Sequence, residues 1–287
     1  MPNLFEILNK QDIIELLYDF IEKLSEKTGR NVIVYYSGWL NKSVEDSGIN
    51  DFDKNGFMAM VNGLDFDKGV DLILHTPGGN VAATESIIYY LHQIFGNNIR
   101  AVVPQLAMSG GTMIACSCNE IIMGKQSSLG PIDPQFNGVP AQGVIEEFKK
   151  AKKEVKQDPS CVPLWQMIIG KYDPTFINSC QQAIEWSEQI LEDSLRNFVD
   201  SDYDDEDIEK IVKGLSSHKE TKAHERQLSP DRCKEIGLNI SMMEDDDDLQ
   251  DLILSIHHCC MTIFLTSNTY KIFSNNLRRN LKFEITN

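Results

Sequence analysis

Three short apolar segments, each followed by a turn that contains glycine, set the strongest constraint on the fold of this chain. The segments are residues 71–75, 100–103 and 120–123, and helical patterns at 84–95 and 109–116 separate them. Short apolar runs bounded by such turns are typical of strands buried on both faces. Strands that alternate with helices in this order predict an α/β fold with a mostly parallel sheet.

The remaining apolar patterns extend this prediction. Residues 31–36 predict a further buried strand. Apolar residues at helical spacing predict helices at 4–28, 53–63, 144–156, 176–198, 229–238 and 249–273. We expect a single domain over residues 1–287, with its core at about 30–140 and a helical C-terminal part at about 141–287.

Charge and composition narrow the class of partner. The net charge of −16 argues against nucleic acid and against anionic lipid, because both favour a basic surface. We find no run of about 18 apolar residues and no signal-peptide pattern, so we expect no membrane span. The seven cysteines are odd in number and irregular in spacing, which favours free thiols and a cytoplasmic location.

No cofactor and no metal is expected. The run His257-His-Cys-Cys260 contains ligand-type residues, but adjacent residues of one helix point in different directions. No other set of residues has the spacing of a metal site.

The three turns are the candidate site. They are His75-Thr-Pro-Gly-Gly-Asn80, Ala107-Met-Ser-Gly-Gly-Thr112 and Ser127-Ser-Leu-Gly-Pro-Ile-Asp133. Loops that follow successive parallel strands gather at the carboxyl edge of the sheet, where ligands bind. Glycines allow a substrate backbone to approach closely and leave N–H groups free to meet it.

Ser109 is the candidate nucleophile. It lies where a strand turns into a helix, so its hydroxyl would be exposed and the following N–H would point at the same place. Each motif alone has a plainer interpretation, because Ser before a helix is most often a cap and Pro-Gly-Gly is most often a turn.

The three motifs in this order resemble the Clp-like peptidase group, which includes the Clp proteolytic subunit and the signal peptide peptidase A type. The resemblance is greatest to the serine dehydrogenase proteinases, and it rests on residues 72–79, 103–115 and 123–135. It implies a Clp/crotonase-like fold, a serine-type peptidase acting on peptides or proteins, and a homo-oligomer.

The resemblance also assigns roles. It implies that Ser109 is the nucleophile and that the amides of Gly78 and Gly110 hold the oxyanion. It further implies that substrate binds along Gly79, Ser128 and Gly130.

The general base is left open between two kinds of residue. Gln126 stands where the Clp subunit has its histidine, whereas the signal-peptide-peptidase branch uses a lysine after the third motif. Lys149, Lys150, Lys152 and Lys153 lie in that region, and we expect the base among them. A lysine base needs burial to lower its pKa, and the alternative for each of these lysines is a solvated helix face.

Two histidines are further candidates. His224 is the alternative base, because its ordinary pKa already suits the role. His75 precedes the Pro-Gly-Gly turn, but a histidine at a strand end is more often structural.

Two other functions compete with the peptidase. One is acyl transfer of the crotonase type, which also uses two backbone amides, and the other is an assembly module without catalysis. An apolar stripe at helical spacing is a second hint of a homo-oligomer, although it would equally suit packing on the chain's own core; its residues are Ile253, Ile256, Cys260, Ile263 and Phe264.

Overall fold

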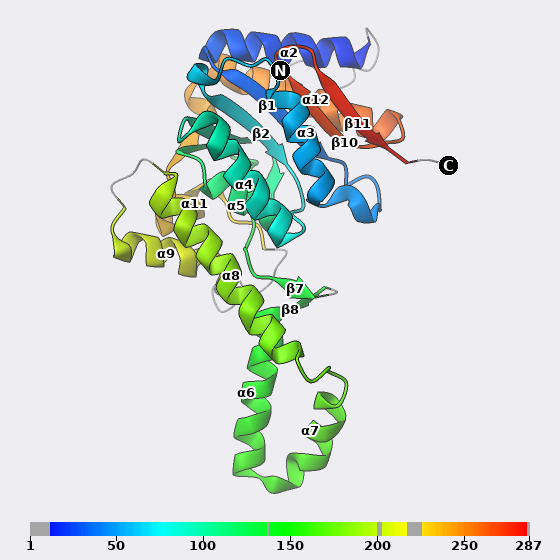
Figure 1. Ribbon diagram of the computed structural model, residues 1–287, viewed down its shortest axis with the longest axis vertical. Coiled ribbons are helices and arrows are strands. Elements are labelled where there is room, and N and C mark those ends of the chain that lie inside the picture. Colours follow the sequence, from blue (N-terminus) through cyan, green and yellow to red (C-terminus); the bar gives the residue numbers. More distant parts are fainter. Residues whose placement is uncertain (1–11, 137, 200–202, 217–225, 286–287) are drawn as a thin grey trace.

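A seven-stranded sheet forms the centre of the protein (Figure 1). The structure is a computed structural model and describes residues 12–136, 138–199, 203–216 and 226–285. The strand order is β11-β10-β1-β2-β3-β5-β9. The strands are β1 (Asn31–Ser37), β2 (Val70–His75), β3 (Ile99–Val103), β5 (Glu120–Met123), β9 (Ile240–Met242), β10 (Thr269–Asn275) and β11 (Asn280–Glu284).

The sheet is mostly parallel, as the sequence predicted. Strands β1, β2, β3, β5 and β9 pair in parallel, and only the β10–β11 hairpin runs antiparallel at one edge. The carboxyl ends of β2, β3 and β5 therefore lie at one edge, followed by the three glycine-containing turns. The predicted α/β fold is confirmed.

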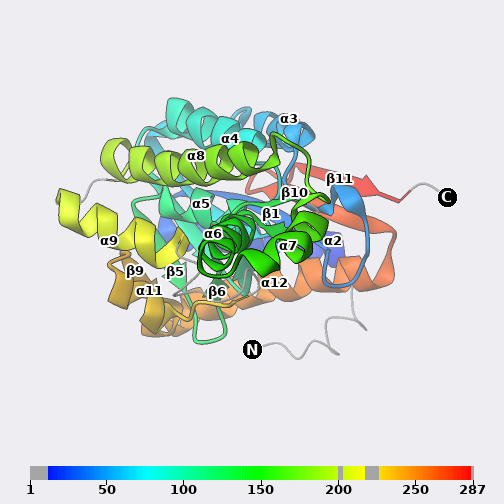
Figure 2. The same ribbon diagram turned by 90° about the horizontal axis from the view of Figure 1, so that it is seen from below.

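Helices cover both faces of the sheet (Figure 2). One face packs against α2 (Ile13–Thr28) and α12 (Asp247–Thr266), which also contact each other. The opposite face packs against a larger set of helices, namely α3 (Asp51–Val61), α4 (Val81–Phe95), α5 (Gly110–Cys116), α8 (Phe176–Asn197), α9 (Asp205–Ser216) and α11 (Pro230–Ile236). Alternate residues of β1 supply the two cores, because successive side chains of a strand point to opposite faces.

A helical arm projects from the carboxyl edge of the sheet (Figure 1). It consists of α6 (Ala141–Gln157), α7 (Val162–Ile169) and the first turns of α8, and the short hairpin of β7 (Gln135–Phe136) and β8 (Val139–Pro140) lies at its base. A small separate core holds the arm together, built on Ala141, Val144 and Cys180.

The C-terminal prediction was partly wrong. The helix expected at 249–273 is α12, which ends at Thr266, and the chain then enters β10. The apolar stripe of α12 is buried on the chain's own core, so it offers no surface to a second copy.

Helix α12 is long and apolar enough to cross a membrane by length and composition, yet half of its most apolar stretch is buried against the rest of the fold. Of the helix expected at 4–28, residues 4–11 lie outside the described residues.

Two histidines lie between the sheet and α12, of which His75 is buried and His257 is half-buried. The Nδ1 atom of His75 is 3.1 Å from the carbonyl oxygen of Ser37, and its Nε2 atom is 3.1 Å from Oε1 of Gln105. The ring of His257 lies 5.7 Å from that of His75, centre to centre, and its Nδ1 atom is 3.1 Å from the hydroxyl of Tyr36. Burial lowers the pKa of His75 to about 4 and that of His257 to about 3.

These histidines should make the fold sensitive to acid. Their pKa values are lower in the folded state than in the unfolded state, so stability is complete above about pH 6.5 and falls as the pH drops toward 4. Each histidine should cost about 2 kcal/mol of unfolding free energy between pH 7 and pH 4.5. Urea unfolding of wild type and of His75→Gln at both pH values measures this. The variant should lose less on acidification, whereas an equal loss in both proteins would contradict the prediction.

Candidate active site

Ser109 lies in a strained turn between β4 (Leu106–Ala107) and α5. Its backbone angles are φ 50° and ψ −114°, which a residue with a side chain rarely adopts. Such a conformation costs on the order of 1–3 kcal/mol and persists only where neighbouring bonds enforce it. The N–H of Met108 donates to the carbonyl of Thr76 (3.0 Å), and the N–H of Gly111 donates to the carbonyl of Met108 (2.8 Å). The end of β2 thus fixes the turn that carries Ser109.

The turn after β2 packs directly against Ser109. Gly78 has φ 87°, and a Cβ atom added there would lie 2.6 Å from the Cβ of Ser109. Gly79 is held from its other side by Ile49, whose N–H donates to the carbonyl of Gly78 (2.7 Å) and whose carbonyl accepts from the N–H of Asn80 (2.8 Å). Glycine is therefore required at both positions, because the chain's own Ser109 and Ile49 lie so close; the approach of a substrate backbone stays a prediction.

A buried ion pair supports the segment 48–50. Nζ of Lys271 lies 2.8 Å from Oδ1 of Asp53 and also donates to the carbonyl of Gly48 (2.8 Å). Asp53 accepts further bonds from the hydroxyl of Tyr35 (2.8 Å) and from the N–H of Asn50 (3.1 Å). The side chains of Lys271 and Asp53 are only 2% and 1% exposed. This cluster connects the C-terminal strand β10 to the glycine turn.

The third motif braces the Ser109 turn from behind. The hydroxyl of Thr112 donates to the carbonyl of Gly130 (2.9 Å), and the N–H of Gly130 approaches the same hydroxyl (3.0 Å). Leu129 pairs with Leu228 through two backbone bonds of 3.1 and 2.8 Å. Ser128 and Gly130, predicted to bind substrate, are buried behind the turn and do not line the pocket.

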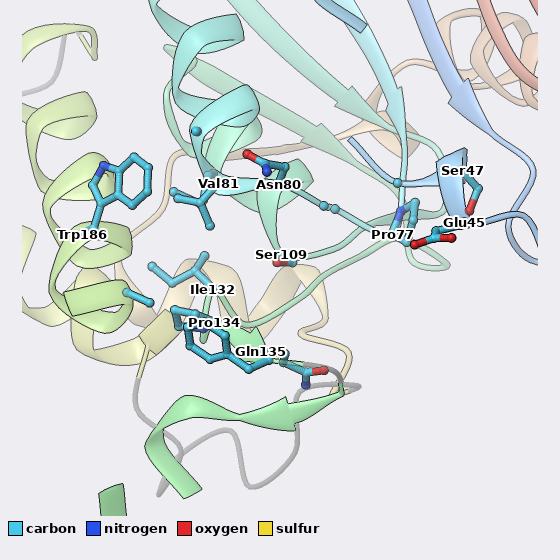
Figure 3. A pocket seen from close by; sticks show the side chains of 17 residues that line it. Glu45, Ser47, Pro77, Asn80, Val81, Ser109, Ile132, Pro134, Gln135 and Trp186 are labelled. Atoms are coloured by element: carbon cyan, nitrogen blue, oxygen red, sulfur yellow. The ribbon is translucent and has the colours of Figure 1, made fainter. Parts of the chain in front are cut away.

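A pocket of about 650 Å³ opens in front of Ser109 (Figure 3). One wall is apolar, and Figure 3 shows Trp186 of α8, Val81 of α4 and Ile132 on that side. The opposite side carries Glu45 and Ser47. The glycine turn forms the backbone edge between them.

Two backbone amides close to Ser109 have no hydrogen-bond acceptor in the part of the chain that the structure describes. Among the described residues, neither the N–H of Gly110 nor that of Gly79 donates to an acceptor, and the hydroxyl of Ser109 is equally unbonded. Gly79 is extended along Ile49, so its N–H points away from Ile49. The N–H of Gly78, in contrast, lies 3.2 Å from Oγ1 of Thr76. Gly79 and Gly110 are thus the better-placed pair of donors for an oxyanion.

The structure does not bring the predicted lysines to Ser109. Lys149, Lys150, Lys152 and Lys153 are exposed on α6 in the arm. Lys149 lines a different cavity, of about 400 Å³, between α6 and α8. The four side chains therefore lie on a solvated helix face, which was the alternative to a role as general base.

The other candidates for the base lie elsewhere. His75 is buried on the face of the sheet opposite α5. Gln126 donates to the carbonyl of Pro104 (3.0 Å) and has a structural role. His224 lies outside the described residues. In the part of the chain that the structure describes, no three His, Cys, Asp or Glu side chains gather in a way that would hold a metal.

Comparison with known proteins places this geometry in a family. A model of the ClpP-like SDH-type serine proteinases matches residues 49–254. The chain belongs to that family. The match begins at Ile49 and spans all three turns.

Two relatives come from the archaeon Methanocaldococcus jannaschii. The uncharacterized protein MJ1495 is 30% identical over 175 residues, which are 61% of this chain and 53% of that protein. The uncharacterized protein MJ0137 is 28% identical over 188 residues, which are 66% of this chain and 59% of that protein. The chain thus matches little more than half the length of these relatives.

Sequence reasoning missed four residues that shape the site. Glu45, Ile49 and Trp186 contact the pocket or its edge from segments that carry no motif, and Lys271 acts from the far end of the chain. A signal did exist for Lys271, because it is a charged residue inside the otherwise apolar run 270–273. Such a residue has to be paired when the strand is buried.

Gly78 provides a direct test of this packing. Gly78→Ala should move Ser109 and slow its reaction with a fluorophosphonate roughly 100-fold, since displacements of about 1 Å cost that much. The matched control is Gly96→Ala, because Gly96 also has positive φ (59°) but nothing lies within 4 Å of the added atom. Equal labelling rates in the two variants would show that the close contact with Ser109 has no role.

Proposed function

We propose that this protein is a serine peptidase in which Ser109 attacks the scissile carbonyl. The observation that carries the proposal is the strained turn at Ser109, which presents an unbonded hydroxyl to the pocket beside two free amides. Family membership supports the same reaction class.

In this mechanism Oγ of Ser109 bonds to the carbonyl carbon and a base takes the hydroxyl proton. The amides of Gly79 and Gly110 stabilise the negative charge that develops on the carbonyl oxygen. The proton then passes to the leaving amine, and water hydrolyses the acyl-enzyme. Helix α5 begins immediately after Ser109, so its first N–H groups add positive potential at that point.

The two competing functions have less support. Acyl transfer of the crotonase type would use the two amides but has no use for a nucleophile presented in a strained turn. A module for assembly alone would need neither the free hydroxyl nor the pocket. We therefore rank both below hydrolysis of peptide bonds.

Ser109→Ala should abolish peptide hydrolysis and fluorophosphonate labelling while the fold remains intact. Oγ is the only atom removed, and in the described chain it makes no hydrogen bond whose loss would destabilise the protein. Casein and short peptides serve as substrates, and circular dichroism confirms folding. The peptidase proposal fails if the variant hydrolyses peptides as fast as wild type.

For the base we propose His224 ahead of the lysines. Leu228 pairs with Leu129 beside the third motif, and His224 is four residues upstream. The ordinary pKa of a histidine already suits a base near neutral pH. The lysines lie on the exposed face of the arm.

The two kinds of base differ in their pH dependence. With His224 as the base, kcat/KM should reach a plateau near pH 7, whereas a lysine base should give activity that rises through pH 8 to 9. His224→Ala should be inactive, and Met at Lys149, Lys150, Lys152 or Lys153 should leave activity unchanged. The reverse result would establish the lysine and exclude His224.

The homo-oligomer stays a proposal, and so does a cytoplasmic location. Because the stripe of α12 is buried, the surface for self-association has to be sought elsewhere. Leu164 and Met167 of α7 are 58% and 74% exposed near the end of the arm, and we propose this apolar surface as the contact between copies.

A further inference from the structure

We infer that Glu45 binds a positively charged group of the substrate, so that the pocket selects peptides with an apolar residue on one side of the scissile bond and a cation on the other. The cation is a lysine or arginine side chain or a free amino terminus. This inference rests on the proposed peptidase function and specifies the substrate class of the same site.

The two sides of the pocket differ in chemistry. The side of Trp186 is made of carbon-rich side chains, including Val81 and Ile132, and Trp186 itself remains 40% exposed. Among the described residues that line the pocket, Glu45 alone carries a charge. Figure 3 shows Glu45 and Trp186 on opposite sides of Ser109. A peptide bound across Ser109 would therefore contact both.

Glu45 has no cation to neutralise it within the described chain. The ion pairs of that part of the protein do not include Glu45, whereas nearby Asp53 is paired with Lys271. An unpaired carboxylate at the wall of a pocket attracts an incoming cation without first having to break another bond. The net charge of −16 adds a general attraction for cationic substrates.

The backbone that carries Glu45 is firmly held. Glu45 belongs to a short 3₁₀ helix, Glu45–Ser47. The carbonyl of Ser47 accepts from the buried hydroxyl of Ser37 (2.6 Å), and the carbonyl of Gly48 accepts from Lys271 (2.8 Å). Both bonds anchor the backbone next to Glu45, so the residue stays at the pocket while its exposed carboxylate is free to meet a cation.

The expected effect is moderate. Glu45 is exposed, so a contact with a cation is screened by water and should change affinity about five-fold. High salt should reduce the effect, because the Debye length shortens as ionic strength rises.

The test measures binding to the full chain carrying Ser109→Ala, which prevents turnover. Each fluorescent peptide has one central leucine. The three positions before the leucine and the three positions after it are substituted in turn, by lysine or by its uncharged counterpart norleucine. Fluorescence anisotropy gives the affinities at low and high salt. The additional variants are Glu45→Gln, Glu45→Lys and the control Asp46→Asn, which removes the same charge from the adjacent residue outside this pocket.

Lysine should improve binding over norleucine about five-fold on one side of the leucine only. Glu45→Gln should remove this preference, Glu45→Lys should transfer it to peptides with glutamate in place of lysine, and Asp46→Asn should retain it. The inference is overturned if no peptide binds, if lysine and norleucine bind equally, or if Glu45→Gln and Asp46→Asn have the same effect.

Failure of the Glu45 inference and failure of the peptidase proposal give different experimental results. A charge preference in the binding assay without any hydrolysis by wild type would refute the peptidase and keep the Glu45 contact. Hydrolysis by wild type without a charge preference would refute the Glu45 contact alone.

Discussion

The buried ion pair between Lys271 and Asp53 connects the last strands of the chain to the pocket. Removing either partner would leave the other charge buried and unpaired, which costs on the order of 3–5 kcal/mol. The pair is well satisfied, because Asp53 also accepts from Tyr35 and Asn50 and Lys271 donates to Gly48. An apolar pair of the same volume would fill the space but could not bond the backbone of segment 48–50. The ion pair thus both stabilises segment 48–50 and fixes its position, and this segment in turn holds Gly78 and Gly79.

Charges are arranged differently at the two ends of the sheet. At the amino ends of the strands, buried Asp71 binds Arg30 and Arg100, and Arg100 also approaches Glu120. These bonds tie β2, β3 and β5 together away from the pocket. At the carboxyl ends, neutral glycine turns and free N–H groups face the pocket. Among the described residues that line the pocket there is no cation, which leaves backbone N–H groups as the donors for an oxyanion at this edge.

The central strands were predictable because each is a short apolar run closed by a glycine turn. Residues 120–123 form β5 with the bounds expected from the sequence. The boundary between α12 and β10 was missed although four polar residues, 266–269, interrupt the apolar pattern there, because the break contains neither glycine nor proline and apolar residues resume at Tyr270. An apolar pattern alone does not separate a buried helix from the buried strand that follows it.

The candidate site, like the fold, was predictable from sequence only in part. The three motifs were expected to meet because the order of parallel strands determines which loops are neighbours. The residues that complete the pocket, Glu45 and Trp186, come from segments whose position depends on tertiary packing. The lysines of α6 were expected near Ser109 because the resemblance to the signal peptide peptidase A type implies a lysine base after the third motif, but the arm carries α6 away from the sheet.

The conformation of Ser109 supports the proposal of a reactive site over that of a remnant of one. Glycine would adopt φ 50° without a Cβ penalty, so a turn that served only to start α5 would gain stability from glycine at this position. The chain instead keeps a side chain there and stabilises the turn through Thr76, Thr112 and Gly130. Those bonds compensate for a strained residue whose hydroxyl makes no hydrogen bond within the described chain. The strain therefore contributes to the presentation of Oγ, which is what a nucleophile requires.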